Sequence, residues 1–155
     1  MKKLKDLSPA DLAFCMTLAG LRRWFHRERG TATGMALGEM NNLNNEDIGL
    51  IAEYAFCKHY HKFFDGTFGG GDPGWDVFIN GKRVDIKAID KDHLNLVVNI
   101  YPEPKADMYL LIYVTGTENF ILGWAARDDV ANRNNITDLG HGDRYVVLQE
   151  NLNKW

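Results

Sequence analysis

The spacing of apolar residues predicts two helices in the first part of the chain. Ser8 and Pro9 have the residue types of an N-cap and a first helical position, and they predict a helix over about residues 9–29. Asn45 caps a second predicted helix, over about residues 46–64. The apolar sides of the two helices consist of Leu12, Cys15, Met16, Ala19 and Trp24, then Ile48, Ile51, Ala52, Ala55 and Phe56.

The rest of the chain is dominated by strand patterns. Residues 93–101 alternate in polarity, and the nearly continuous apolar run 108–114 is typical of a central strand that is buried on both faces. Further strands are expected at 120–126 and 144–148, with a short helix at about 128–133 between them. This order predicts one α/β (α+β) domain over residues 1–155, in which helices flank a central mixed sheet.

A tight hairpin carries the most informative polar residues. Asn80 and Gly81 stand between strand-forming residues and predict a two-residue type I′ turn. The resulting register pairs Ile79 with Lys82, Phe78 with Arg83, Val77 with Val84 and Asp76 with Asp85. Lys87 then shares a face with Asp85, because side chains alternate along a strand. Two opposed carboxylates repel each other, so a divalent cation between them is expected.

Composition places the chain among globular proteins without a membrane span. Hydrophobic residues make up 45% and charged residues 25% of its 155 positions. No segment approaches the ~18–20 uninterrupted apolar residues of a transmembrane helix, and Asp6 and Asp11 interrupt the apolar stretch that a signal peptide needs. Two cysteines in predicted helices, Cys15 and Cys57, favour a reducing compartment, so the cytoplasm is the expected location.

Charge is distributed unevenly along the chain. The net charge is −3, but residues 1–30 hold seven Lys or Arg against three Asp or Glu. A basic helix beside an acidic remainder is a weak indication of polyanion binding. Arg22, Arg23 and Arg27 either contact a phosphate backbone or form a solvated helix face, and the sequence leaves both open.

The polar residues together resemble a known family. A helical Glu53, then Asp76, then Asp85 and Lys87 separated by one residue, is similar to the PD-(D/E)XK nuclease superfamily, which has the restriction-endonuclease-like fold. The resemblance spans roughly residues 46–130, and it includes the apolar strand 107–114 and the following strand 121–125. Trp75 stands where the family usually has proline, and register selects Asp76 rather than Asp72 as the first aspartate.

The resemblance implies a metal-dependent DNA endonuclease. Glu53, Asp76 and Asp85, with the backbone carbonyl of Ile86, would bind Mg²⁺, for which Mn²⁺ can substitute. Lys87 would orient or deprotonate the attacking water, or stabilise developing negative charge. Arg22, Arg23 and Arg27 would contact DNA.

Several alternatives stay open at this stage. The chain is expected to form a homodimer or higher homo-oligomer, and restriction, homing, repair and junction resolution are all compatible with it. The family is common in phages and mobile elements, so host-cell cytoplasm is an equivalent location. An exonuclease or RNA-directed nuclease of the same fold is the nearest alternative, and a non-catalytic nucleic-acid-binding module is the alternative outside enzymes.

Overall fold

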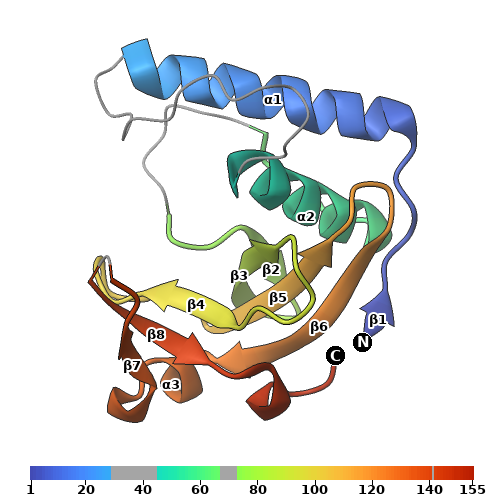
Figure 1. Cartoon of the computed structure of the whole chain (residues 1–155). Coiled ribbons are helices and arrows are strands. Elements are labelled where there is room, and N and C mark those ends of the chain that lie inside the picture. Colours follow the sequence, from blue (N-terminus) through green and yellow to red (C-terminus); the bar gives the residue numbers. More distant parts are fainter. Residues whose placement is uncertain (29–44, 67–72, 141) are drawn as a thin grey trace.

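The computed structural model describes residues 1–28, 45–66, 73–140 and 142–155 and has an α+β architecture (Figure 1). A mixed, curled sheet lies between helices on one side and a second, smaller sheet on the other. The elements in chain order are β1 (Lys2–Lys3), α1 (Pro9–Glu28), α2 (Asn45–His59), β2 (Val77–Ile79), β3 (Lys82–Ile89), β4 (Leu96–Asn99), β5 (Met108–Val114), β6 (Asn119–Ala126), α3 (Arg127–Val130), η1 (Arg133–Asn135), β7 (Ile136–Asp138), β8 (Asp143–Val147) and η2 (Gln149–Asn151).

The larger sheet has the strand order β1-β6-β5-β3-β2. Strands β3 and β5 are parallel, with Asp85 level with Tyr109 and Lys87 level with Leu111, and the other neighbours are antiparallel. The smaller sheet has the order β4-β8-β7. The predicted central strand is confirmed, because β5 lies between β3 and β6 and is buried over most of its length.

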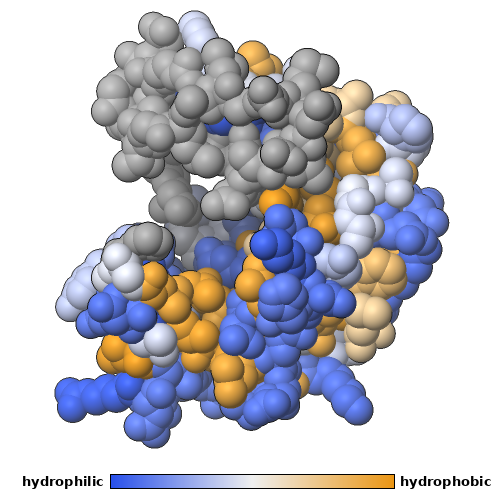
Figure 2. Space-filling model, in the orientation of Figure 1, coloured by the Kyte–Doolittle hydropathy of each residue, from blue (hydrophilic) through white to orange (hydrophobic). Residues whose placement is uncertain are grey.

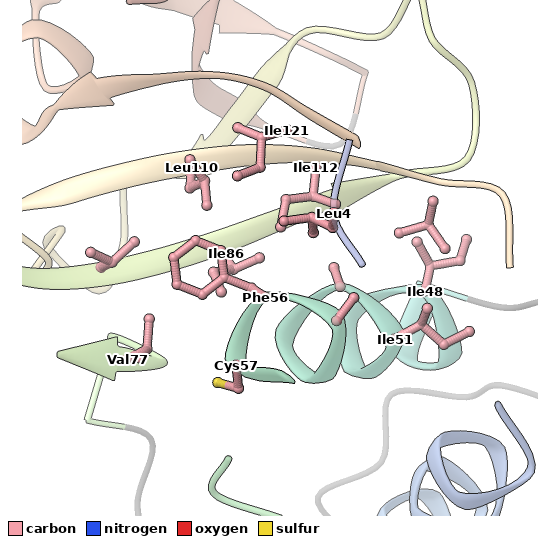
Figure 3. Packing of buried hydrophobic residues seen from close by; sticks show 14 of the residues in the cluster. Leu4, Ile48, Ile51, Phe56, Cys57, Val77, Ile86, Leu110, Ile112 and Ile121 are labelled. Carbon is pink, nitrogen blue, oxygen red and sulfur yellow. The ribbon is translucent and has the colours of Figure 1, made fainter. Parts of the chain in front are cut away.

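Two hydrophobic cores form, one on each face of the larger sheet. On one face, side chains of β3, β5 and β6 pack against α2, and Figure 3 shows Phe56 of α2 directed toward Ile86. On the opposite face, Tyr109 and Leu111 pack with residues of the smaller sheet and α3. Alternation along β3 therefore sends Val84 and Ile86 to the α2 core, and Asp85 and Lys87 to the other face.

The predicted hairpin turn is confirmed. Asn80 and Gly81 both have positive φ, at 49° and 78°, as a type I′ turn requires. The pairs Val77–Val84, Phe78–Arg83 and Ile79–Lys82 have the predicted register. The register was predictable because it depends only on the two adjacent turn residues, whose turn type sets which residues of the two strands face each other.

Helix α1 begins where Ser8 and Pro9 predicted. The Ser8 Oγ accepts from the Asp11 N–H at 3.2 Å, and the Asp11 carboxylate accepts from the Ser8 N–H at 2.7 Å. Lys58 and the Tyr54 hydroxyl of α2 donate to the same carboxylate. Lys58, then Ser8, hold the pKa of Asp11 well below its usual range. One carboxylate thus caps α1 and joins it to α2.

The second predicted helix was too long. Helix α2 ends at His59 instead of about residue 64, because His61 adopts a left-handed conformation with φ of 52°. The Lys62 N–H then donates to the Cys57 carbonyl at 2.8 Å, which is the terminal bond of a Schellman-type helix end. Tyr60, directly after the helix, accepts hydrogen bonds at its hydroxyl from Lys2 Nζ and Trp155 Nε1.

The smaller sheet has a partly apolar outer surface. Leu94, Val97 and Leu148 are among its exposed hydrophobic residues, and Figure 2 shows apolar surface over β4 and β8. Strand β4 is shorter than the predicted strand 93–101, while β1 and β7 were not predicted. Among the described helices, none is long and apolar enough to cross a membrane.

Gly123→Ala is expected to lower the free energy of unfolding by about 1–3 kcal/mol. A Cβ on Gly123 of β6 would lie 2.7 Å from the Leu152 Cβ and 2.8 Å from the Asn153 carbonyl oxygen. This segment is held by hydrogen bonds between Asn153 and Trp124 in both directions. The matched control is Gly49→Ala in α2, where no atom lies within 4 Å, and there alanine should stabilise by about 0.5–1 kcal/mol. Urea unfolding measures the stability of both variants. Equal changes in the free energy of unfolding for Gly123→Ala and Gly49→Ala would contradict the steric explanation.

Candidate active site at the edge of the hairpin

The four predicted catalytic residues come from three parts of the fold. Asp76 immediately precedes β2, Asp85 and Lys87 lie on β3, and Glu53 lies in α2. Helix α2 covers the face of the sheet that holds Val84 and Ile86. Glu53 is half-buried, so it stands at the border of this packed surface rather than within it.

Asp76 directly precedes β2, and it forms hydrogen bonds with β3 beyond the end of that strand. Its Oδ2 accepts from the Ile86 N–H at 2.6 Å, and its own N–H donates to the Val84 carbonyl at 2.9 Å. The regular ladder therefore starts at Val77–Val84, and the predicted Asp76–Asp85 pair lies one residue outside it. The carboxylate of Asp76 bonds where a backbone carbonyl would otherwise do so, and this fixes its position at the strand edge.

The charges of Glu53, Asp76 and Asp85 act on one another. The pKa of Asp76 is raised to about 8, first by burial, then by the charges of Glu53 and Asp85. The Ile86 N–H and the charge of Lys87 oppose this rise. Burial, followed by the charges of Glu53 and Asp76, raises the pKa of the Cys57 thiol to about 12. Glu53 on α2 and the two aspartates of the hairpin thus share one electrostatic neighbourhood.

Lys87 supplies positive charge to this neighbourhood. Its Nζ lies 2.8 Å from Asp85 Oδ1, with the Lys87 side chain 38% exposed and the Asp85 side chain 14% exposed. Tyr109, level with Asp85 on β5, has its pKa raised to about 12 by burial and then by the charge of Asp85. Asp85 therefore lies between Tyr109 and Lys87 and is mostly buried, whereas the Lys87 side chain is partly exposed.

The chemistry of the donors fits a hard cation, but the side chains are not arranged as a closed metal site. Over residues 1–28, 45–66, 73–140 and 142–155, no group of three or more His, Cys, Asp or Glu is placed to hold a metal ion. The Ile86 N–H and C=O point to the same side of β3, so its carbonyl lies on the side where Asp76 bonds. Carboxylate and carbonyl oxygens are ligands that Mg²⁺ prefers.

Two of the arginines of α1, Arg22 and Arg23, are bound within the chain. Arg23 Nη1 lies 2.8 Å from Oδ1 of the buried Asp47, and Arg22 Nη2 donates to the Asp65 carbonyl at 3.2 Å. These contacts join α1 to α2 and to the segment that follows it. The side chain of Arg27 lies outside the described part of the chain. Contact of these arginines with DNA stays a prediction.

Sequence reasoning missed a group of cations beside the hairpin. A cavity of about 270 Å³ is lined by Arg83, Glu103, Pro104, Lys105 and Arg127. Alternation along β3 was a usable signal for Arg83, which shares a face with Asp85. Lys105 and Arg127 are brought there by the fold, since they precede β5 and follow β6.

The chain has no match among protein-family models, curated proteins or solved structures.

Proposed function

We propose that this protein is a metal-dependent nuclease of the PD-(D/E)XK type that hydrolyses internal phosphodiester bonds of DNA. The observation that carries the proposal is the grouping of Glu53, Asp76, Asp85 and Lys87 near one strand edge, where burial and then the charges of Glu53 and Asp85 raise the pKa of Asp76 and the charge of Lys87 opposes the rise. Perturbed carboxyl groups with a specific charged neighbour are typical of functional sites. The order of a glutamate helix, an aspartate and an Asp-x-Lys strand is also the order that the resemblance implies, and a restriction-endonuclease-like core is part of the proposal.

Each residue has a distinct role in this proposal. Glu53, Asp76, Asp85 and the Ile86 carbonyl would hold Mg²⁺ or Mn²⁺. When bound, the cation supplies charge neutralisation at the phosphate and a more acidic water. Lys87 would leave Asp85 for the attacking water or the phosphate oxygens, where its ammonium orients the water and stabilises developing negative charge.

The main competitor is a module that binds nucleic acid without cleaving it. The ion pair between Lys87 and Asp85 favours this competitor, as does the lack of a three-ligand group over the described residues. The cost of holding three half-buried, mutually repelling carboxylates near one another argues against this competitor. A binding module has no use for such repulsion, whereas a cation relieves it.

The direct test is incubation with supercoiled plasmid, linear duplex, single-stranded DNA, a four-way junction and RNA, each in Mg²⁺, Mn²⁺ or EDTA. We expect nicked or linear plasmid in Mg²⁺ and Mn²⁺ and intact plasmid in EDTA. Binding without cleavage in every metal would establish the module instead. Dependence on free ends would indicate an exonuclease, and cleavage of RNA alone an RNA-directed nuclease. Sedimentation of the same samples tests the expected homodimer or higher homo-oligomer.

A further inference from the structure

We infer that the outer face of the β2–β3 hairpin binds an unpaired nucleotide next to the bond that is cut, so that the substrate is single-stranded, frayed or branched. The inference rests on the proposed function, which places the reacting phosphate at the carboxylates. It adds the class of substrate, which the catalytic residues do not determine.

The first element of this face is an exposed aromatic ring. Phe78 is 56% exposed, although Val77 and Ile79 on either side of it are buried. Alternation therefore directs Phe78 to the same face as Asp85, away from the α2 core. Trp75 supports the ring, with the two ring centroids 6.4 Å apart in an edge-on arrangement. Exposed aromatic rings bind unpaired bases by stacking, and a base inside a duplex is not available for this contact.

The second element is the group of cations around the cavity. Arg83 is the cross-strand partner of Phe78 and stands two residues before Asp85, which is about 7 Å along the strand. Asp107 accepts hydrogen bonds from Arg83 Nε at 3.0 Å and Nη2 at 2.7 Å. A guanidinium has five N–H donors, so three remain for a ligand after these two bonds.

Lys105 and Arg127 extend the positive surface of the cavity. A Cβ placed on Gly74 would lie 3.2 Å from the Lys105 Cβ, so Lys105 packs against the segment that leads to Asp76. The Arg127 side chain is 46% exposed, with its Nε 3.5 Å from Asp128. Glu103 is the acid among the lining residues, while Asp107 pairs with Arg83 and Asp128 lies beside Arg127. The remaining N–H donors of the two arginines, together with the Lys105 ammonium, suit the oxygens of a phosphate group.

The Phe78 ring and the three cations of the cavity together form a binding site for one nucleotide, called the binding track below. A phosphate between Arg83, Lys105 and Arg127 lies beside the reacting phosphate at Asp85, and the base attached to it reaches the Phe78 ring. The cations contribute affinity without regard to sequence, and the ring adds selection for a base that has left the duplex. A continuous blunt duplex can place a phosphate among the cations, but it offers no unpaired base to stack on Phe78.

The test measures binding in EDTA on the Asp85→Asn chain, so that it does not depend on cleavage. The probes are a labelled single strand, a blunt duplex of the same sequence and a duplex with a single-stranded flap. We expect tighter binding of the single strand and the flap. Phe78→Ala should weaken both by about 5- to 100-fold and leave the blunt duplex unchanged. Phe78→Trp should retain the preference, and Phe63→Ala, which removes another exposed ring, should have no effect.

Arg127→Gln tests the phosphate contact separately. It should weaken all three probes by a similar factor and reduce the magnitude of the slope of log affinity against log salt by about 0.7 for the single strand and about 0.9 for the blunt duplex. Equal affinity of the parent chain for single strand and blunt duplex, or no change with Phe78→Ala, would overturn the inference even if plasmid is cut. A Phe78-dependent preference in a chain that cuts nothing would support the binding track and refute the proposed nuclease.

Discussion

Lys87→Met should lower Mg²⁺-dependent DNA cleavage by about 10²–10³-fold, the loss typical of removing one group that stabilises transition-state charge. Lys87 forms an ion pair with Asp85 and its side chain is partly exposed, so the ammonium can move to a water without unfolding the strand. Methionine keeps the length and the apolar stem of the side chain. We therefore expect an unchanged circular dichroism spectrum beside the lost activity, with a lower urea midpoint in EDTA because Asp85 loses its ion pair.

The matched control is Lys82→Met on the same strand. Lys82 is exposed at the hairpin turn, opposite Ile79, and lies outside the carboxylate neighbourhood. It should retain cleavage. Asp85→Asn should lose both cleavage and Mn²⁺ uptake measured by calorimetry, because it removes a proposed ligand. Full cleavage activity in Lys87→Met would show that Lys87 has no role in catalysis. Unchanged Mn²⁺ uptake in Asp85→Asn would show that Asp85 is not a metal ligand.

The second large effect is on stability, and it depends on pH. The pKa of Asp76 is raised from 3.8 to about 8 in the folded chain, first by burial and then by Glu53 and Asp85. The folded state holds this proton more tightly than the unfolded state does. The protonated Asp76 side chain therefore contributes fully to the free energy of unfolding below about pH 4. This contribution is lost as the pH rises through 8.

Asp76→Asn should consequently stabilise the metal-free protein at alkaline pH. The amide is never charged, and its oxygen can still accept from the Ile86 N–H. We expect a gain of roughly 1–3 kcal/mol in unfolding free energy at pH 9, since one pKa unit corresponds to about 1.4 kcal/mol. The gain should shrink as the pH falls toward 4. Urea unfolding in EDTA from pH 4 to pH 9 measures it.

The control for this series is Asp90→Asn, at an exposed position directly after β3. Its effect should not vary with pH in the same way. Addition of Mn²⁺ at pH 9 should stabilise the parent chain and not Asp76→Asn, because a ligand stabilises only the state that binds it. A stability difference for Asp76→Asn that grows toward acid pH would contradict the raised pKa.

Local signals in the sequence predicted much of the fold. The Asn80–Gly81 turn set the register of the hairpin, and Ser8 with Pro9 set the start of α1. The end of α2 was not predictable in this way, because His61 takes a left-handed conformation that is favoured for glycine or asparagine. Strands β1 and β7 consist of two and three exposed residues, so they have no buried face to produce a pattern.

In the candidate site too, features set by neighbouring residues were predictable, and features set by tertiary contacts were not. Alternation alone gave the common face of Asp85 and Lys87, which the structure confirms. The roles of Arg22 and Arg23 depended on partners that are remote in sequence, Asp47 and the Asp65 carbonyl. A lone sequence shows that an arginine is present, but tertiary packing decides whether its charge is already used inside the molecule.

The Tyr60 hydroxyl joins Lys2 to Trp155, so the first and last segments of the chain meet at a single side chain. The two ends of the chain also lie near each other in Figure 1, so a peptide linker can join them into a ring. Ring closure reduces the conformations that are available to the unfolded chain. This protein is therefore a suitable starting point for head-to-tail cyclisation and for circular permutation.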